Sequence, residues 1–260
     1  MTTALVTGAS SGIGAVFAEQ LAAQGYDVIL VARSQDKLQA IADRLTLSHG
    51  VKTTVIQQDL LAEGATDSLF NQLEQQQITL DMLVNNAGFG TYGELADGEL
   101  QTYLNMIQLN VSVLVDLTYR ALQGMKARRS GSILNLSSTA AFQPIPYFAV
   151  YAASKSFVLN FSEALWYECK PYNIKVLGVC PGPTETEFFQ RADFPDTMKS
   201  APGQTYASPE EVVKEALQAL DQGHSHVVTG GLTNQLLVSA GRLMPREMLT
   251  QATGKMFKAD

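Results

Sequence analysis

A tyrosine and a lysine four residues apart could form a proton-transfer pair. Tyr151 and Lys155 lie in a stretch of helical periodicity, so both side chains leave the same face of the helix. A free phenol titrates near about 10, but a neighbouring ammonium stabilises the phenolate and lowers that pKa. The pair therefore predicts acid–base chemistry near neutral pH. Because the same spacing occurs on ordinary helix surfaces, the other motifs of the chain decide its meaning.

A glycine-rich turn separates the first predicted strand, Thr3–Thr7, from the first predicted helix. Gly8 permits a tight turn, Gly12 lets backbone approach a pyrophosphate, and Gly14 lets the helix pack on the strand. The helix start adds free N–H groups and the positive end of its dipole, so the turn predicts a dinucleotide site. The expected cofactor contacts are Gly8, Ser10, Ser11, Gly12, Ile13 and Gly14.

The same turn contains a second pattern. Gly8–Gly12 has the form Gly-x-Ser-x-Gly, which is the nucleophile elbow of α/β-hydrolases, with Ser10 as the nucleophile. In that fold an earlier loop donates an N–H to the oxyanion, whereas here the turn follows the first predicted strand, which leaves no earlier loop to donate it. A serine hydrolase is therefore kept as an alternative that ranks behind a dinucleotide-dependent enzyme.

The second predicted strand, Tyr26–Val31, ends beside a basic residue. Dinucleotide sites commonly place a carboxylate here to hold the adenine ribose 2′-hydroxyl, whereas this chain has Ala32 and then Arg33. A guanidinium pairs well with a 2′-phosphate, which favours NADP(H) over NAD(H). After the third predicted strand, Asp59 and Leu60 could flank the adenine, although Asp59 could equally cap a helix.

Short β-branched segments alternate with amphipathic stretches along the chain. This alternation predicts a parallel sheet covered by helices on both faces. No linker divides residues 1–260, so we expect a single Rossmann-like, doubly wound α/β domain, with a substrate lid at 183–207 and a helical tail at 231–260. The predicted strands are Thr3–Thr7, Tyr26–Val31, Val51–Gln57, Leu80–Val84, Gly131–Leu136, Ile174–Val179 and His226–Thr229.

Five motifs occur in the order and approximate spacing of one enzyme family. They are Thr7–Gly14, Asn85–Gly88, Ser138, Tyr151 with Lys155, and Pro181–Gly182. Over about residues 3–229 the chain resembles the classical short-chain dehydrogenases/reductases, in the branch that carries an NADP-type arginine after the second strand. The resemblance implies an oxidoreductase that transfers a hydride between NADP(H) and a carbonyl or secondary alcohol.

The resemblance also implies catalytic roles. Tyr151 would protonate the carbonyl oxygen during reduction, and Ser138 would donate a hydrogen bond to that oxygen. Ser137 is chemically equivalent, but the spacing to Tyr151 favours Ser138. Lys155 would hold the nicotinamide ribose and lower the Tyr151 pKa. Asn110 would position a water beside the lysine, and the alternative for Asn110 is an asparagine bonded to backbone inside a helix.

The family resemblance adds cofactor contacts at two further strand ends. They are Asn86, Ala87 and Gly88 on the adenine-ribose side, and Pro181 and Gly182 on the carboxamide side. Thr184 or Thr186 would bond the carboxamide or the pyrophosphate, and the sequence leaves that choice open. Family members commonly pair the helices that correspond to residues 94–126 and 151–169, so we expect a homodimer or homotetramer.

Three loops that follow predicted strands carry aromatic residues and few charges. We therefore expect a small, neutral, largely apolar ketone or alcohol as substrate. The tail after Gly230 is amphipathic and Met-rich. It could cover this pocket, form an oligomer contact or rest on a membrane, in that order of preference. The residues expected around the substrate are Phe89, Phe142, Pro144, Tyr147, Phe148, Phe188 and Phe189.

Composition limits the other classes of function. With 18 Lys and Arg against 25 Asp and Glu, the net charge is −7, which argues against a nucleic-acid partner. The sequence shows no apolar run of roughly 18 residues and no signal-peptide pattern, and its two cysteines are too few for a zinc site. We therefore expect a cytoplasmic protein without a metal. A non-catalytic NADP-binding sensor or scaffold is the main alternative, which a missing catalytic residue would favour, and none is missing.

Overall fold

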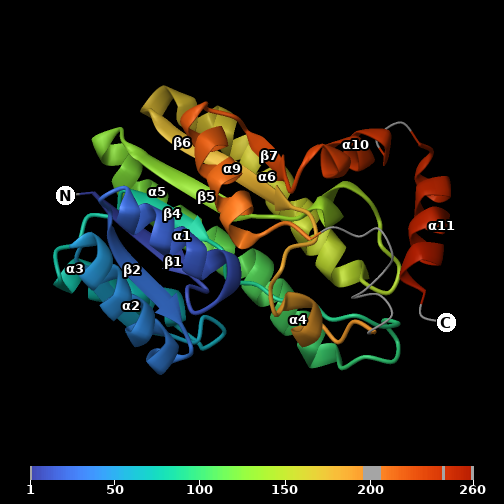
Figure 1. The fold of residues 1–260 in the computed structure, drawn as a ribbon, viewed down its shortest axis with the longest axis horizontal. Coiled ribbons are helices and arrows are strands. Elements are labelled where there is room, and N and C mark those ends of the chain that lie inside the picture. The colour runs from blue at the N-terminus through green and yellow to red at the C-terminus, as the bar shows by residue number, and fades with distance from the viewer. Residues whose placement is uncertain (1, 196–205, 242–243, 259–260) are drawn as a thin grey trace.

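Seven parallel strands form a single twisted sheet with helices on both faces (Figure 1). The computed structural model describes residues 2–195, 206–241 and 244–258. The strand order is β3-β2-β1-β4-β5-β6-β7, and every neighbouring pair is parallel. The predicted doubly wound α/β sheet is confirmed.

The elements follow one another in regular alternation. The strands are β1 Thr3–Thr7, β2 Asp27–Ala32, β3 Thr53–Gln57, β4 Met82–Asn85, β5 Gly131–Leu136, β6 Ile174–Pro181 and β7 His226–Thr229. The α-helices are α1 Gly12–Ala23, α2 Gln35–His49, α3 Ala65–Gln75, α4 Leu100–Ile107, α5 Leu114–Arg128, α6 Ala149–Cys169, α7 Phe188–Arg191, α9 Pro209–Asp221, α10 Leu232–Gly241 and α11 Arg246–Phe257. A π-helical turn, η1 Gln108–Val113, joins α4 to α5, and 3-10 turns lie at η2 Thr139–Phe142 and η3 Lys170–Tyr172.

Alternating side chains of each strand build two separate cores. In β1, Ala4 and Val6 pack with Phe17 of α1 on one face, together with residues of α2 and α9. Leu5 points to the other face and packs with Leu117 of α5. Because successive strand residues face opposite sides, a strand covered on both faces must be apolar throughout. Each fully buried large apolar side chain contributes about 1.5–3 kcal/mol, so these two layers fix the sheet that carries the site.

The strand order reverses direction between β1 and β4. From β1 the chain winds outward to β2 and β3, and then crosses back to β4 on the other side of β1. At such a switch point the loops leave the sheet in opposite directions and open a crevice beyond the carboxyl ends of the strands. The glycine turn after β1 and the Asn85–Gly88 segment after β4 both lie at this position.

The segment expected to be a substrate lid begins and ends on paired backbone. Thr184 and Ala207 form a parallel bridge, in which Glu185 N donates to Ala207 O (3.0 Å) and Ala207 N donates to Pro183 O (3.0 Å). The described part of this excursion contains α7, and residues 196–205 lie outside the described residues. The bridge fixes the two ends of the excursion beside β6.

The tail after β7 forms two helices, α10 and α11, which extend past the edge of the sheet (Figure 1). Among the described residues, no helix is both long enough and apolar enough to span a bilayer.

Candidate active site

The glycine turn has a backbone path that side chains would obstruct. Gly8 and Gly12 adopt left-handed conformations, with φ of +64° and +54°. A Cβ at Gly14 would lie 2.4 Å from Gly8 O and 2.4 Å from the Asn86 side-chain nitrogen. The start of α1 therefore packs directly on the turn, and its N–H groups face open space. An anionic group fits here, because backbone donors and the helix dipole converge on a site that no Cβ occupies.

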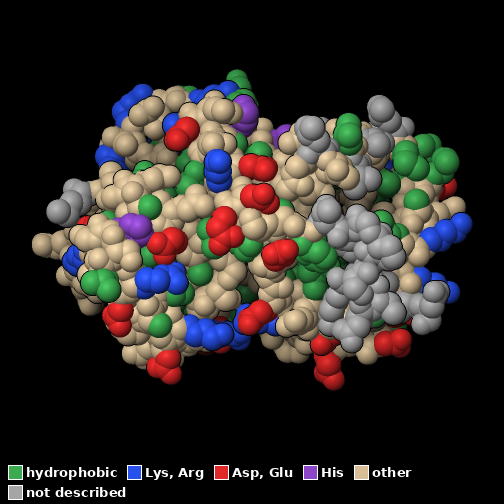
Figure 2. Space-filling model, in the orientation of Figure 1, with side chains coloured by type: hydrophobic (Ala, Val, Ile, Leu, Met, Phe, Trp, Pro, Cys, Tyr) green, Lys and Arg blue, Asp and Glu red, His purple; other side chains and the backbone are tan. Residues whose placement is uncertain are grey.

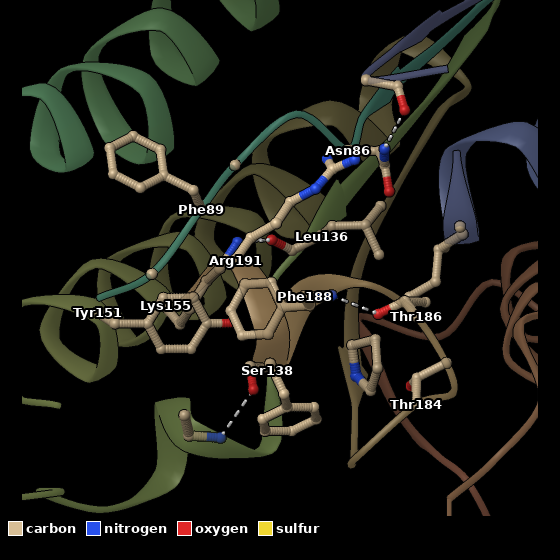
Figure 3. Close-up of a pocket in the computed structure, with 18 of the residues that line it drawn as sticks. Asn86, Phe89, Leu136, Ser138, Tyr151, Lys155, Thr184, Thr186, Phe188 and Arg191 are labelled. Atoms are coloured by element: carbon tan, nitrogen blue, oxygen red, sulfur yellow. Dashed lines mark hydrogen bonds between the residues drawn. The ribbon is translucent and has the colours of Figure 1, made fainter. Parts of the chain in front are cut away.

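Hydrogen bonds join the end of β4 to the glycine turn. Asn86 Nδ2 donates to Thr7 O (2.9 Å), and Thr7 Oγ1 accepts from Asn86 N and Ala87 N (3.0 Å each). The asparagine segment was predicted to contact the cofactor, and the structure shows that it also has a structural role. Asn86 holds two strand ends in register and also lines the cavity beside them (Figure 3).

Basic side chains predominate at the end of the cavity beside β2, where the sequence analysis predicts the adenine ribose; this end is called the adenine end. Arg33, which follows β2, lines it together with Asp59 and Leu60, and their contact with a cofactor stays a prediction. Asp59 Oδ1 accepts a hydrogen bond (3.0 Å) from the backbone N–H two residues later, so the turn-capping alternative is also realised. Lys37 of α2 lines the same end and was missed by the sequence reasoning. The sequence does contain an indication of this, since Lys37 lies four residues after Arg33, in the first turn of the following helix.

Ser138, Tyr151 and Lys155 meet at the centre of the cavity. Ser138 follows β5, and the other two lie one turn apart near the start of α6. Tyr151 and Lys155 are only 7% and 6% exposed. Lys155 Nζ donates to Leu136 O (2.7 Å) and lies 5.6 Å from the centroid of the Tyr151 ring. The Tyr151 hydroxyl is hydrogen-bonded to Ser138, and Figure 3 shows the three side chains converging from two elements.

The two neighbouring serines have different partners. Ser137 Oγ is buried and donates to the backbone carbonyl of Lys155 (2.7 Å), which fastens β5 to α6. Ser138 Oγ instead accepts from Ala140 N (3.1 Å) and faces Tyr151. Since Ser137 has already used its proton, the geometry agrees with the choice of Ser138 as the donor toward a substrate.

Burial controls both titratable groups of this cluster. It raises the pKa of Tyr151 above its ordinary value, and the hydrogen bond with Ser138 offsets only part of that rise. It lowers the pKa of Lys155 to about 8. The net lowering of the Tyr151 pKa that the sequence predicts is therefore not found in the cofactor-free chain, because burial penalises the phenolate. Tyr151 keeps its proton at neutral pH, which is the state that a proton donor requires.

Asn110 lies behind the cavity wall, in η1. Its Nδ2 donates to Phe89 O (2.9 Å) and to Ser154 Oγ (3.1 Å), and its Oδ1 accepts from Phe89 N (3.1 Å). The side chain is thus occupied by protein groups, which matches the backbone-bonded alternative. A Cβ at Gly88 would lie 2.9 Å from Asn110 Oδ1 and 3.5 Å from Lys155 Nζ. The role of Asn110 in holding a water stays a prediction, and π-helical turns often mark functional sites.

A buried chain of amides and hydroxyls positions α6 on the sheet. Asn85 Nδ2 donates to Thr118 Oγ1 and to Asn135 Oδ1 (2.9 Å each), and Asn135 Nδ2 donates to Ser162 Oγ (3.0 Å). The chain links β4, α5, β5 and α6 in one layer. Buried polar networks of this kind favour one packing arrangement, and here that arrangement sets the position of Tyr151, although Asn85 Oδ1 has no hydrogen-bond partner among the described residues.

The two threonines after β6 have distinct environments. Thr184 is buried and donates to Gly182 O (2.9 Å). Thr186 Oγ1 accepts from Phe188 N (3.3 Å), so its own proton is not used in that bond. A Cβ at Gly12 would lie 3.1 Å from Thr186 Cγ2, which places this loop directly over the glycine turn. Thr186 is therefore the better candidate for a phosphate contact.

Asn234 of α10 is a cavity residue that the sequence reasoning missed. Its Nδ2 donates to Thr229 O and to Gly230 O (3.0 Å each), and a Cβ at Gly182 would lie 2.1 Å from that nitrogen. The close approach explains why glycine follows Pro181. Nothing in the residue pattern of the tail indicates that it returns to β6.

Aromatic rings form the wall of the substrate end. Phe148 stacks on Tyr151 with ring centroids 4.3 Å apart, and Phe188 lies 5.3 Å from the Tyr151 ring. Phe89 and Phe189 also line this end, as predicted, and Phe194 was missed. A flat apolar substrate would fit against these rings, because aromatic faces present large apolar areas in fixed orientations.

Three residues expected around the substrate lie elsewhere. Phe142 packs beside His226, with ring centroids 6.1 Å apart. Pro144 turns its carbonyl toward α11, where Thr253 Oγ1 donates to it (2.8 Å). Tyr147 adopts a positive φ of 64° and lines a separate hollow of about 340 Å³. Their loop turns back on itself, so only Phe148 reaches Tyr151.

The tail helix α11 closes the far side of the substrate end. Tyr92 Oη donates to Phe257 O (2.6 Å), and Thr253 ties the helix to Pro144. The last residues of α11, from Lys255 to Phe257, and Lys258 after them line the cavity. Of the three positions considered for the tail, the one over the pocket matches where α11 lies.

One cavity of about 1410 Å³ runs from Arg33 to Phe257 and joins both ends. Two expected site residues do not line it: Gly14 packs beneath the turn, and Asn110 lies behind Gly88. The expected residues that do line it are Gly8, Ser10, Ser11, Gly12, Ile13, Arg33, Asp59, Leu60, Asn86, Ala87, Gly88, Ser138, Tyr151, Lys155, Pro181, Gly182, Thr184 and Thr186.

The hydrolase alternative finds no support in this arrangement. Ser10 lies at the phosphate end of the cavity, and none of the chain's three histidines lines it. Within the described ranges, no group of three His, Cys, Asp or Glu side chains comes together in a way that could hold a metal ion. His226 instead pairs with Glu163 of α6 (2.8 Å).

This combination of a switch-point glycine turn and a buried Ser–Tyr–Lys cluster defines an oxidoreductase of the NAD(P)(H)-dependent class, acting on CH–OH groups. The chain belongs to the short-chain dehydrogenase family, whose family model, described as short chain dehydrogenase, matches residues 2–195.

Several relatives match nearly the whole chain. It is 32% identical to mouse 17-beta-hydroxysteroid dehydrogenase type 3 over 98% of this chain and 80% of that protein. It is also 32% identical to mouse very-long-chain 3-oxoacyl-CoA reductase, over 94% of this chain and 76% of that protein. Among solved structures, a short-chain dehydrogenase from Sphingobium yanoikuyae in complex with NADPH is 31% identical, with a TM-score of 0.81, over 93% of this chain and 94% of that one.

Proposed function

We propose that this chain is an NADP(H)-dependent carbonyl reductase/alcohol dehydrogenase in which Tyr151 is the general acid and base. The single observation that carries the proposal is the place of Tyr151. It is buried and protonated, it is bonded to Ser138, and it lies where the phosphate end of the cavity meets the aromatic end.

The residues of the chain divide the reaction between them. When bound, the reduced nicotinamide supplies the hydride that reaches the carbonyl carbon. Tyr151 donates its proton to the carbonyl oxygen, which completes the alcohol, and Ser138 donates a hydrogen bond that stabilises negative charge on that oxygen. The Lys155 ammonium beside Tyr151 stabilises the phenolate that remains, and it would hold the nicotinamide ribose when the cofactor is bound. The phenolate regains its proton from solvent before the next turnover.

The preference for NADP(H) rests on the adenine end. Arg33 and Lys37 line it, and Asp59 is the carboxylate on that side among the described lining residues. Asp59 Oδ1 is already bonded to backbone. Two cations can meet a 2′-phosphate, whereas a ribose 2′-hydroxyl gains little from them. The related Sphingobium yanoikuyae structure is a complex with NADPH.

The aromatic wall supports an apolar ketone or secondary alcohol as substrate. The related proteins are named for hydroxysteroids and 3-oxoacyl-CoA, which both combine a carbonyl with a long apolar body. A cavity of about 1410 Å³ exceeds the usual 300–1,000 Å³ of a single-ligand pocket, so it can hold a dinucleotide and a sizeable substrate together.

We also propose a cytoplasmic homo-oligomer. Apolar side chains are exposed on α4 and along the outer surfaces of α5 and α6, including Leu104, Ile107, Tyr119, Phe157 and Tyr167. Phe157 and Phe161 stack on that surface of α6. Exposed apolar side chains on these helices favour pairing with a second copy, and light scattering of the purified chain would measure the resulting mass.

Oxidation of NADPH with a panel of ketones, followed by absorbance, tests the function. We expect turnover of bulky apolar ketones with NADPH, and about tenfold or more lower kcat/KM with NADH. Arg33→Ala should reduce that cofactor preference, because a charged hydrogen bond of about 1.5–3 kcal/mol is lost. Binding of NADPH without turnover of any ketone or alcohol would instead favour the sensor or scaffold alternative.

A further inference from the structure

The substrate end of the cavity contains positive charge that the reaction does not use. Among the described residues, six cationic side chains line the cavity against two carboxylates, Asp59 and Glu187, in a chain of net charge −7. The six cations are Arg33, Lys37, Lys155, Arg191, Lys255 and Lys258. Positive potential in a cavity of an acidic protein favours anionic ligands, and the position of each charge shows which part of the ligand it would meet.

Four of the six cations have partners or assigned positions. Arg33 and Lys37 lie at the adenine end, and Lys155 lies beside Tyr151. Arg191 pairs with Glu187 of the same helical turn in α7. The remaining two, Lys255 and Lys258, come from the end of α11, and neither has a carboxylate within 4.0 Å among the described residues.

We infer that the substrate of the proposed reductase is an amphipathic anion, with a carbonyl at Tyr151, an apolar body against the aromatic wall, and an acidic group at Lys255 and Lys258. The inference rests on the proposed function. The acidic group is a carboxylate or a phosphate, and the two classes share the ability to accept hydrogen bonds from ammonium groups.

The position of α11 supports this assignment. Tyr92 Oη donates to Phe257 O (2.6 Å), so Phe257, which directly precedes Lys258, is attached to the loop that follows β4. Thr253 Oγ1 donates to Pro144 O (2.8 Å), and a Cβ at Gly254 would come within 3.2 Å of Pro146. These contacts hold the end of α11 against the aromatic wall, and Lys255 and Lys258, which are exposed, both line the cavity there.

The arrangement gives the substrate a defined polarity. Phe148 stacks on Tyr151, and Phe194 follows at 4.9 Å from Phe148 and 6.3 Å from Phe257. A chain of ring contacts thus leads from Tyr151 to Phe257, which directly precedes Lys258. A ligand that follows these rings presents its carbonyl at one end and its acidic group at the other. Figure 2 shows basic side chains (blue) at the surface of the α11 end.

Lysines near a helix C-terminus also stabilise the helix dipole, so the test must separate anion binding from support of α11. The probes are a medium-chain keto acid and its methyl ester, and a 3-oxoacyl thioester of 4′-phosphopantetheine and the same thioester of pantetheine. Within each pair the apolar body and the carbonyl are the same, and the members differ in whether the acidic group is charged or is blocked or absent. The readout is the ratio of kcat/KM for the charged over the neutral member.

We expect the wild type to have a higher kcat/KM for at least one charged probe than for its neutral partner. The charged probe should have the lower KM, while kcat stays similar. The double variant Lys255→Ala/Lys258→Ala should lower that ratio about three- to tenfold, since exposed ion pairs are individually modest. Raised salt should lower the wild-type ratio in the same way. Lys214→Ala, which removes an exposed lysine from α9, is the matched control and should leave the ratio unchanged.

The result also identifies the acidic group. Preference for the keto acid over its ester indicates a carboxylate, and preference for the phosphopantetheine thioester over the pantetheine thioester indicates a phosphate. Equal kcat/KM for charged and neutral members in the wild type, or an equal loss of both in the double variant, would overturn the inference while ketone reduction itself persists. No turnover of any of the four probes or of the neutral ketone panel would refute the proposed function and the inference with it.

Discussion

The two ends of the cavity are built in different ways. At the phosphate end, the turn after β1 and the segment after β4 are hydrogen-bonded to each other at the sheet edge, and glycines leave no space for a Cβ. At the substrate end, loops after β4, β5 and β6 meet α11, and single hydroxyl contacts from Tyr92 and Thr253 attach that helix. The first end is part of the sheet, whereas the second is assembled from separate segments around it.

This difference indicates which functions can vary without loss of the fold. Backbone that binds a phosphate must keep one path, so the phosphate end tolerates few substitutions. Side chains that line an apolar wall can be exchanged at a cost limited to packing. Substrate choice can therefore change while the cofactor site is kept. The following substitutions test each end and the residues between them.

Tyr151→Phe tests the boundary between the two ends and should have the largest effect. It removes the proton donor but keeps the ring that stacks on Phe148, so we expect kcat to fall about 10²- to 10⁴-fold. Binding of NADPH, measured by fluorescence titration, should stay within about twofold, because the hydroxyl lies away from the glycine turn.

The matched control is Tyr147→Phe, which makes the same change on a tyrosine that lines the separate hollow. Its turnover should equal that of the wild type. A Tyr151→Phe enzyme that retains most of its turnover would assign the proton to another donor and contradict the mechanism.

Lys155→Met tests the free-energy cost of burying the Lys155 ammonium where the two ends of the cavity meet. Burial lowers the Lys155 pKa from 10.5 to about 8, so below pH 8 both the folded and unfolded states carry the charge and the folded state bears the whole cost. Between about pH 8 and 10 the folded state loses its proton first, because the unfolded state binds it more tightly. The free energy of unfolding should therefore rise with pH, by at most about 3 kcal/mol for this group.

Urea unfolding at several pH values measures that contribution. Burial raises the Cys180 pKa from 9.0 to about 12, which lowers stability as pH rises above about 9, but wild type and Lys155→Met share this thiol. The stability of the variant relative to the wild type should therefore decrease as pH rises from about 8 to 10. A difference independent of pH would show that the Lys155 pKa is the same in the folded and unfolded states, so that burial does not shift it.

Gly14→Ala tests the phosphate end. A new Cβ would lie 2.4 Å from Gly8 O, so either α1 or the turn must shift, at a cost of about 1–3 kcal/mol. We expect lower stability and about tenfold weaker NADPH binding. The control is Gly124→Ala in α5, where the added Cβ meets only the flexible end of Arg128. It should leave NADPH binding unchanged and stability equal or slightly higher. Equal NADPH affinity for Gly14→Ala and wild type would contradict the requirement for a fixed turn.

The fold was predictable because each core layer leaves a local signal. β1 is apolar on both faces, which is typical of a strand inside a parallel sheet, and its turn residues follow directly. The Ser208–Glu211 pair marks the start of α9, and both reciprocal hydrogen bonds of a capping box are present (3.2 Å each). The π-helical turn between α4 and α5 left no such signal, because its extra residue follows from packing against α6.

The site was predictable only where residue type expresses a backbone requirement. Gly8 and Gly12 report positive φ, and Tyr151 with Lys155 reports a shared helix face. The Tyr151 pKa was misjudged because desolvation depends on the surrounding atoms, which no motif encodes. Phe142 and Tyr147 were misplaced because loop aromatics choose among several neighbours. The return of α10 and α11 to the cavity depends on contacts between residues far apart in the chain.

Tyr92→Phe tests the substrate end and should have the smallest effect. The change removes the hydrogen bond to Phe257 O but keeps the ring, so it weakens one of the contacts that hold the end of α11 by about 1 kcal/mol. We expect KM for a bulky ketone to rise about two- to fivefold, while kcat and NADPH affinity stay constant. Tyr103→Phe is the control, since its hydroxyl bonds Glu94 O (3.4 Å) on the same side of the molecule without contacting α11. If Tyr92→Phe lowered NADPH affinity as much as it raised KM, the two ends would be coupled, because an independent substrate end predicts a change in KM alone.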